Sequence, residues 1–213
     1  SYILSVSAGG SLQPDISPGS LVFVDQYIDK THGRRRSFFG EGVVGHVPFG
    51  EPICDLLRQA SFDAARSAGI EALVPTGTYI CIEGPTFSTR AESRLHQSWG
   101  GHVVGMTNLP EARLAREAEI SYASAVFVTD WDCWKDRDDV DVREILKILR
   151  KNTIAGRALI RHLAKRFADG LIPAVNPQKG IAQYAIVTDK DKVPAKRKND
   201  LDLIYAEYMD SAE

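Results

Sequence analysis

Short apolar runs alternate along this chain with stretches in which apolar residues recur every three or four positions. The runs predict strands, and they cover residues 1–7, 21–29, 78–82, 101–105 and 123–128. The recurring spacing predicts helices, and it covers residues 52–68, 109–118 and 142–163. Strands that alternate with helices indicate an α/β fold with a mostly parallel or mixed central sheet flanked by helices.

The periodic pattern divides the chain into two parts. It holds to about residue 170 and then weakens, which predicts an α/β domain over 1–170 and a C-terminal extension over 171–213. Residues 189–202 are charged and rich in lysine, so we expect part of the extension to be mobile, with a short amphipathic helix over 201–209. Ala8-Gly-Gly-Ser predicts a tight turn after the first strand, and the long loop over 30–50 is of a length that is usually functional or disordered.

Composition narrows the classes of function. The 213 residues carry a formal net charge of −2, which argues against the strongly basic face of a nucleic-acid-binding protein. The run Arg34-Arg-Arg predicts a solvated loop. No apolar stretch approaches the ~20 residues that a membrane helix needs. Cys54, expected in a helix, and Cys81, in a strand, have no metal-ligand spacing, so we predict reduced core thiols, no metal site and a cytoplasmic location.

Two acids, Asp130 and Asp132, directly follow the apolar run 123–128. Open α/β sheets bind ligands at the carboxyl ends of their strands, so this pair is a candidate site. A partly buried acid has a raised pKa and can donate a proton to a bound heterocycle. The alternative is structural, since both acids are also residue types that cap a turn or a following helix.

Two further segments, 78–93 and 101–111, repeat the order of strand, polar loop and helix start. The ends of all three strands should therefore lie on one face of the sheet. Thr107 precedes the second helix, and a hydroxyl beside helix N–H groups suits an anion. Ser88 precedes the first helix and has the alternative of being its N-cap.

The three segments share long motifs with one known family. They are Glu-Gly-Pro-x-Phe-Ser-x-Arg-Ala-Glu-Ser (83–93), Gly-Met-Thr-x-x-Pro-Glu (105–111) and Thr-Asp-x-Asp-Cys-Trp-Lys (129–135). Together they resemble the trimeric methylthioadenosine phosphorylases of the purine nucleoside phosphorylase superfamily, from about Ser5 to about Leu163. Members of that family carry an upstream segment with a Gly-rich phosphate loop and an Arg-His pair. That segment is absent from this sequence, so we expect an N-terminally incomplete form of the fold.

The resemblance implies an enzyme of purine and methionine salvage. It would be a pentosyltransferase that converts 5′-methylthioadenosine and inorganic phosphate, without a further cofactor, to adenine and 5-methylthioribose 1-phosphate. Asp130 matches the acid that reads and protonates the base, and Asp132 matches a second acid beside it. The other implied substrate contacts are Phe87, Ser88, Met106, Trp131, Val142, Ile145 and Leu146, and the implied phosphate contacts are Ser7, Ala8 and Thr107.

The same resemblance implies a homotrimer with shared active sites. His46, in the loop over 30–50, matches a histidine that reaches the 5′ end of the neighbouring subunit's substrate. Each role has a simpler alternative: Phe87 and the apolar face of the third helix would be core, Met106 would be ordinary packing, and His46 would be solvated.

Three other functions remain open at this point. The chain could be a 6-oxopurine nucleoside phosphorylase, although relatives of that kind carry Glu and Asn at the positions of Ser88 and Asp130. It could be a nucleosidase that uses water. It could also be a binding or assembly fragment without catalytic competence.

Overall fold

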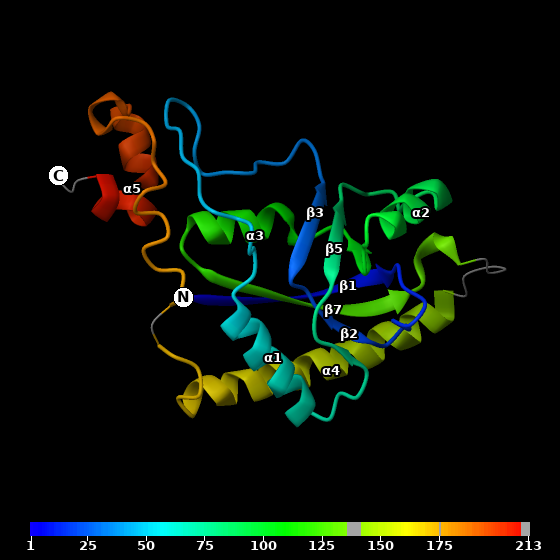
Figure 1. Cartoon of the computed structure of the whole chain (residues 1–213). Coiled ribbons are helices and arrows are strands. Elements are labelled where there is room, and N and C mark those ends of the chain that lie inside the picture. Colours follow the sequence, from blue (N-terminus) through cyan, green and yellow to red (C-terminus); the bar gives the residue numbers. More distant parts are fainter. Residues whose placement is uncertain (136–141, 175, 210–213) are drawn as a thin grey trace.

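A seven-stranded sheet forms the centre of the computed structural model, which describes residues 1–135, 142–174 and 176–209 (Figure 1). The strand order is β3-β5-β6-β1-β7-β2-β4. Four of the six neighbouring pairs are parallel, and the β1–β6 and β2–β7 pairs are antiparallel. The predicted mixed α/β sheet is thus confirmed. The strands are β1 (Tyr2–Ser11), β2 (Leu21–Phe23), β3 (Gln26–Lys30), β4 (Leu73–Val74), β5 (Thr78–Ile82), β6 (Val103–Gly105) and β7 (Ser121–Asp130).

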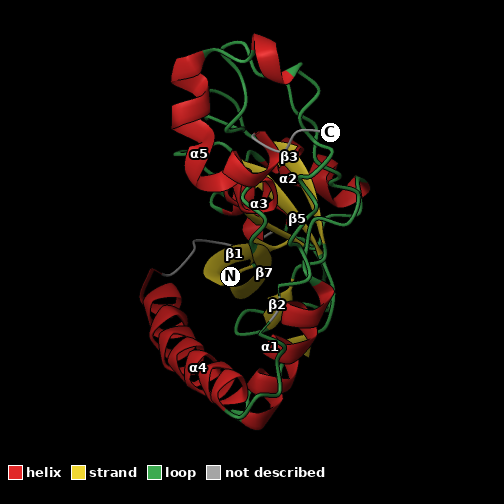
Figure 2. Cartoon of the chain, turned by 90° about the vertical axis from the view of Figure 1, so that its left-hand side faces the viewer, coloured by secondary structure: helices red, strands yellow, loops and turns green. Residues whose placement is uncertain are grey.

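Helices cover both sides of this sheet (Figures 1 and 2). The helices α1 and α4 pack on each other and on β7, while α3 packs on β7 from the other side. All the predicted helices are present, including α2 after the polar loop and α5, which begins six residues before the predicted helix over 201–209. The helices are α1 (Asp55–Ser67), α2 (Arg90–Ser98), α3 (Asn108–Glu117), α4 (Val142–Ala168) and α5 (Ala195–Met209), with the short 3₁₀ helices η1 (Asp132–Trp134) and η2 (Lys190–Lys192).

The region around the first strand differs from the prediction. Residues 8–11 continue β1 and do not form a turn. A Cβ atom added to Gly9 would lie 2.7 Å from the carbonyl oxygen of Val104, and one added to Gly10 would lie 3.0 Å from Asp130 Oδ1. Real Cβ atoms avoid such distances, so this glycine pair serves close approach between β1 and its neighbours rather than a turn.

The predicted strand over 21–29 is two strands. β2 pairs with β7, whereas β3 pairs with β5 on the other side of the sheet. At the crossing, Val24 N donates to Ser124 O, and Asp25 N donates to Gly77 O. Cys54 is the N-cap of α1 and not a helical residue. Cys54 and Cys81 are buried, and both are free thiols, as is Cys133.

The C-terminal extension forms a second, smaller hydrophobic cluster. Helix α5 packs through Leu201, Tyr205 and Met209 on the loop after β3, whose Phe39 ring stacks on Tyr205 at a centroid distance of 5.2 Å. We call residues 31–50 together with 182–209 the loop–α5 unit. Much of the charged stretch 189–202 is thus helical, while the predicted boundary at residue 170 and the mobility of the extension stay predictions.

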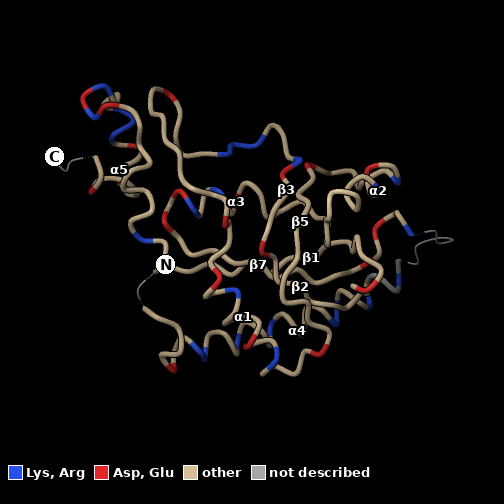
Figure 3. The backbone as a smooth tube through the Cα atoms, in the orientation of Figure 1, with Lys and Arg blue, Asp and Glu red and all other residues tan. Residues whose placement is uncertain are grey.

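Two buried acids connect the loop–α5 unit to the main sheet. Glu117 accepts a hydrogen bond from Phe38 N at 2.7 Å, and its carbonyl oxygen accepts one from the Tyr205 hydroxyl at 2.6 Å. Glu119 accepts from Ala182 N at 2.8 Å and from the Tyr208 hydroxyl at 2.9 Å. Elsewhere, acidic and basic positions are interspersed along the backbone (Figure 3). Within the described ranges, no helix is long and apolar enough to cross a membrane.

Candidate active site

The carboxyl end of β7 carries both predicted acids. Asp130 Oδ2 accepts a hydrogen bond from Thr129 Oγ1 at 2.6 Å, and Oδ1 accepts one from Asp132 N at 2.8 Å. The second bond is an Asx-type turn, so Asp130 does cap a turn as the structural alternative supposed. Each carboxylate oxygen offers about two lone pairs, so the turn leaves acceptor capacity for a ligand.

Asp132 is partly buried and occupies a backbone conformation with φ +52°. Its Oδ2 accepts a hydrogen bond from Ser93 Oγ on α2. Burial raises the pKa of Asp132, and the neighbouring Asp130 carboxylate raises it further. The indole Nε1 of Trp134 donates to Ser11 O at 2.7 Å. This bond fixes η1 on the end of β1.

The loop over 83–89 borders the two acids. Cys133 Sγ lies 3.1 Å from Ser88 O, which links the loop to η1. The N-cap of α2 is Thr89, which forms a capping box with Glu92, so the N-cap alternative for Ser88 is wrong. Ser88 Oγ is buried without a hydrogen-bond partner in the described part of the chain. Phe87 is 84% exposed, so its core alternative is wrong as well.

Met106 lies against the same loop from the end of β6. A Cβ atom added to Gly84, where φ is +71°, would lie 2.6 Å from Met106 Sδ. Thr107 is exposed, and its backbone N donates to the hydroxyl of buried Tyr79 at 3.3 Å. Burial raises the pKa of Tyr79 to about 12, so this hydroxyl stays neutral.

Thr107 does not sit on a regular helix start, as the sequence predicted. Leu109 is extended, with φ −121° and ψ 137°, so the regular turns of α3 begin at Pro110. Thr107 makes no side-chain cap; its Oγ1 lies 3.3 Å from Asn108 Oδ1. Helix N–H groups therefore do not converge beside this hydroxyl, and its predicted phosphate contact depends on the hydroxyl and the local backbone.

Two predicted phosphate contacts, Ser7 and Ala8, lie within β1, the strand that pairs with β7. Ser7 and Ala8 pair with Val126 and Phe127 of β7, and Gly10 pairs with Asp130. The Ser7 hydroxyl is buried without a hydrogen-bond partner among residues that the structure describes. Ala8 is exposed. Among the described residues, the hydroxyls of Ser7 within β1 and of Ser88 in the loop before α2 thus have no hydrogen-bond partner, and an unpaired buried hydroxyl is costly unless a ligand or water satisfies it.

Comparison with known proteins agrees with this geometry. The family model of the phosphorylase superfamily matches residues 1–165. The chain belongs to the phosphorylase superfamily. S-methyl-5′-thioadenosine phosphorylase of Synechocystis sp. (strain PCC 6803 / GT-S) is 45% identical over 218 residues, which cover 99% of this chain and 65% of that relative. The protein of the same name in Geobacter sulfurreducens is 46% identical, covering 97% of this chain and 72% of the relative.

Solved structures lead to the same family. A methylthioadenosine phosphorylase from an antarctic soil metagenomic library has a TM-score of 0.88 and 37% identity, over 95% of this chain and 71% of the other. Methylthioadenosine phosphorylase from Schistosoma mansoni in complex with adenine has a TM-score of 0.78 and 36% identity, over 87% and 73% of the two chains. The resemblance to methylthioadenosine phosphorylases is confirmed.

Some predicted site residues of this phosphorylase-superfamily chain lie apart from the strand ends. His46 is exposed, and its backbone N donates to Ala185 O at 2.8 Å in the loop–α5 unit. Trp131, by contrast, directly follows Asp130 at the end of β7, and its ring lies 6.0 Å from the Trp134 ring and 3.7 Å from Lys135 Nζ. Leu146 on α4 is 51% exposed. The side chains of Val142 and Ile145 lie outside the described part of the structure, as do residues 136–141.

Arg34 links several loops of the site through its guanidinium group, a role that was not predicted from the sequence. Its guanidinium donates to Met106 O at 2.8 Å, to Leu109 O at 2.6 Å and to Glu83 O at 2.7 Å, and it pairs with Glu83 Oε2 at 3.0 Å. Arg34 therefore joins the chain ends of β5 and β6 on the predicted substrate side. The prediction of a solvated run is wrong for Arg34, although Arg35 and Arg36 are exposed.

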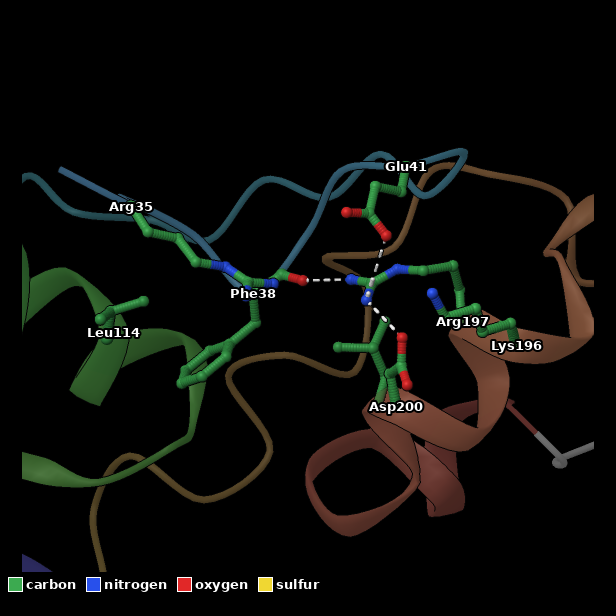
Figure 4. Close-up of a pocket in the computed structure, with 8 residues that line it drawn as sticks. Arg35, Phe38, Glu41, Leu114, Lys196, Arg197 and Asp200 are labelled. Carbon is green, nitrogen blue, oxygen red and sulfur yellow. Dashed lines mark hydrogen bonds and ion pairs between the residues drawn. The ribbon is translucent and has the colours of Figure 1, made fainter. Parts of the chain in front are cut away.

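A pocket of about 490 Å³ lies elsewhere, between α3 and the loop–α5 unit (Figure 4). Arg197 is buried beside it and donates to Phe38 O at 2.6 Å and to Asp200 Oδ2 at 2.8 Å. Its described lining includes none of the predicted site residues. The Arg197 guanidinium is already bonded to Phe38 O and so joins α5 to the loop. We therefore place the candidate active site at the strand ends. The pocket is lined by Arg35, Phe38, Glu41, Leu114, Lys196, Arg197, Asp200 and Leu201.

Proposed function

We propose that this chain supplies most of an enzyme for the phosphorolysis of 5′-methylthioadenosine to adenine and 5-methylthioribose 1-phosphate. The observation that carries the proposal is the pair of acids at the carboxyl end of β7, held by Thr129 and Ser93 beside the loop with Phe87 and Ser88. The names of the relatives support this substrate. The chain spans 65% and 72% of the length of the two relatives compared.

The reaction breaks the bond between C1′ of the sugar and N9 of the purine. Adenine is a poor leaving group as an anion, and protonation at N7 lets it depart neutral. We assign that proton to Asp130, since general acid catalysis of this kind contributes on the order of 10²–10⁴-fold. The bonds from Thr129 and the Asp132 backbone hold the Asp130 carboxyl in one orientation. Asp132 then orients Asp130 or the amino edge of the base.

The same residues favour a 6-aminopurine. The Asp130 carboxylate can accept a hydrogen bond from an amino group but, when ionised, cannot donate one to a 6-oxo group. Ser88 Oγ is buried without a hydrogen-bond partner among the described residues, so it is available to the base. Exposed Phe87 offers an apolar ring to cover base or sugar, and Met106 lies under the same loop beside Gly84.

The phosphate side of the site would be formed by Ser7, Ala8 and Thr107. The Ser7 hydroxyl is buried and has no hydrogen-bond partner in the described part of the chain. Ser7 lies three residues before Gly10, the β1 residue that pairs with Asp130. Phosphate is the co-substrate, and we expect no further cofactor. Among the described residues, no group of three or more His, Cys, Asp or Glu side chains could hold a metal ion.

The 5′ end of the substrate would be covered from a neighbouring subunit of a homotrimer. His46 is exposed and belongs to the loop–α5 unit, which does not include the strand ends of its own chain. Val142, Ile145 and Leu146 at the start of α4 would form the apolar wall for the methylthio group. The free thiols favour the reducing cytoplasm as location.

The decisive experiment measures products in the complete natural protein that contains this chain. Methylthioadenosine should yield adenine and methylthioribose 1-phosphate only when phosphate is present. Formation of free methylthioribose without phosphate would indicate a nucleosidase. Preference for inosine would indicate a 6-oxopurine enzyme, and absence of any product would indicate a binding role.

Shared sites have a separate test. Inactive Asp130→Ala subunits mixed with His46→Ala subunits should regain activity, because a hybrid trimer combines one intact half-site from each. Hybrid trimers that form without regaining activity, or a complete protein that is monomeric by light scattering, would contradict the shared site.

A further inference from the structure

Helix α2 contacts the candidate site through polar side chains. Its two buried residues are Ser93 and His96, and α2 packs on η1. Ser93 is fully buried, and its hydroxyl bonds Asp132 Oδ2. A helix normally buries an apolar stripe, so the burial of a serine and a histidine against an acid points to a role beyond packing.

Ser93 also differs from other serines in the helices of this protein. Ser61 and Ser98 donate to carbonyl oxygens of their own helices, Leu57 O and Leu95 O. Such bonds to the preceding turn are common for helical serine. The Ser93 hydroxyl instead donates to the carboxylate of Asp132, which lies on a different element, η1. A hydrogen bond to a charged acceptor is stronger than a neutral one.

Among the described residues, no Lys or Arg forms an ion pair with Asp132. The ionisable groups that act on Asp132 are Asp130 at the end of β7 and His96 on α2. Burial lowers the pKa of His96, so its imidazole is neutral at pH 7, and its Nδ1 has no hydrogen-bond partner in the described structure. The Asp130 carboxylate repels a second negative charge. The Ser93 hydroxyl is therefore the group on α2 that favours ionised Asp132.

We propose that Ser93 is a positioning residue for the reaction, which orients Asp132 beside Asp130 and favours its ionised form. Ser93 does not touch substrate and acts through Asp132 alone. The backbone N of Asp132 donates a hydrogen bond to Asp130 Oδ1. By fixing the position of Asp132, Ser93 therefore also helps to orient Asp130, the proposed proton donor. The inference rests on the proposed function for its kinetic consequence, but the effect on Asp132 is independent of any substrate.

The first test measures the titration of Asp132 by carbon NMR in the chain labelled at aspartate carboxyl groups. Asp132→Asn identifies the signal by its loss. Ser93→Ala should raise the Asp132 pKa by about one unit, because it removes one hydrogen bond to the charged form. Ser93→Thr, which keeps a hydroxyl, should restore the original value. Ser98→Ala on the exposed side of α2 is the matched control and should leave it unchanged.

An unchanged Asp132 pKa in Ser93→Ala would overturn the proposal. Should Ser93→Ala fail to fold, Ser93→Cys offers a weaker donor of similar size, and a rise in the same direction but of smaller size is expected. In the complete natural protein, Ser93→Ala should move the acid limb of the kcat/KM profile to higher pH and lower kcat more than it changes KM. A wild-type protein without phosphorolysis would count against the proposed function, while the NMR titration would still test Ser93.

Discussion

The strand-end site and the loop–α5 unit are built in opposite ways. At the strand ends, hydrogen bonds among side chains and backbone hold the polar groups of β7, η1 and the end of β1. In the loop–α5 unit, aromatic and aliphatic side chains from distant parts of the chain bury one another, and Arg197 and Glu119 provide the polar links. A substitution at the strand-end site should therefore lower activity with little loss of stability. A substitution in the core of the loop–α5 unit should lower stability with little direct effect on the chemistry.

The largest expected effect is at the acid itself. Asp130→Ala in the complete natural protein should lower kcat/KM for methylthioadenosine about 10²–10⁴-fold, because the leaving base is no longer protonated. Thermal unfolding should change little, since Asp130 is only partly buried. Asp15→Ala, at an exposed acid, is the control. Activity near that of the wild type would remove Asp130 from the mechanism.

The reverse behaviour is expected in the loop–α5 unit. Tyr205 is fully buried and stacks on Phe39, so Tyr205→Ala should cost about 3–5 kcal/mol of local stability. Hydrogen exchange should then speed up in α5 and residues 38–47 while β7 keeps its protection. Leu203→Ala on the same helix is the matched control, because Leu203 is 97% exposed. An equal loss of protection in β7 would show that the two regions unfold as one.

A smaller effect on stability is expected where β1 meets β6. Gly9→Ala places a Cβ atom 2.7 Å from the backbone oxygen of Val104 and 3.0 Å from Val126 Cγ1. The strands must shift, at a cost of about 1–3 kcal/mol in the free energy of unfolding. Gly50→Ala has no atom within 4 Å of the new Cβ and serves as control. Equal urea midpoints for the two variants would mean that β1 and β6 are not as tightly paired as described.

The smallest effect concerns pH. Burial lowers the pKa of His96 below its usual value near 6.5. The unfolded chain therefore binds a proton first as pH falls, and the native state loses stability below about pH 6.5. His96→Phe should remove this loss of stability, as measured by urea unfolding compared at pH 7.5 and 5.5. His32→Phe, at an exposed histidine, should keep the wild-type pH dependence, and a variant of His96 that also keeps it would contradict the assignment.

Local patterns predicted most of the fold and the location of the acids. The apolar runs and their order along the chain place β5, β6, β7, α1, α3 and α4, because burial on a sheet or along a helix face is periodic in the sequence. The N-cap of α2 could also have been predicted from the sequence. Thr89-x-x-Glu92 is a capping-box pattern, and it identifies Thr89 rather than Ser88 as the N-cap.

Other features depend on partners far along the chain. Gly9 and Gly10 appear as a turn in sequence, but their reason is the closeness of Val104 and Asp130. Arg34 looks like part of a solvated run, and only the folded chain brings the carbonyl oxygens of Glu83, Met106 and Leu109 within its reach. Phe38 and Phe39 lie in a long loop, and only the folded chain shows that they pack on α5.

The sequence by itself determined which acids end a buried strand, because an apolar run and the polar residues after it are neighbours along the chain. Only the tertiary structure decided what holds those acids. Asp132 is bonded by Ser93 because α2 packs on η1, and no spacing along the sequence specifies which hydroxyl a helix presents to a distant carboxylate. Neighbours along the chain determine local geometry, whereas the hydrogen-bond partner of a partly buried acid such as Asp132 depends on how distant elements pack.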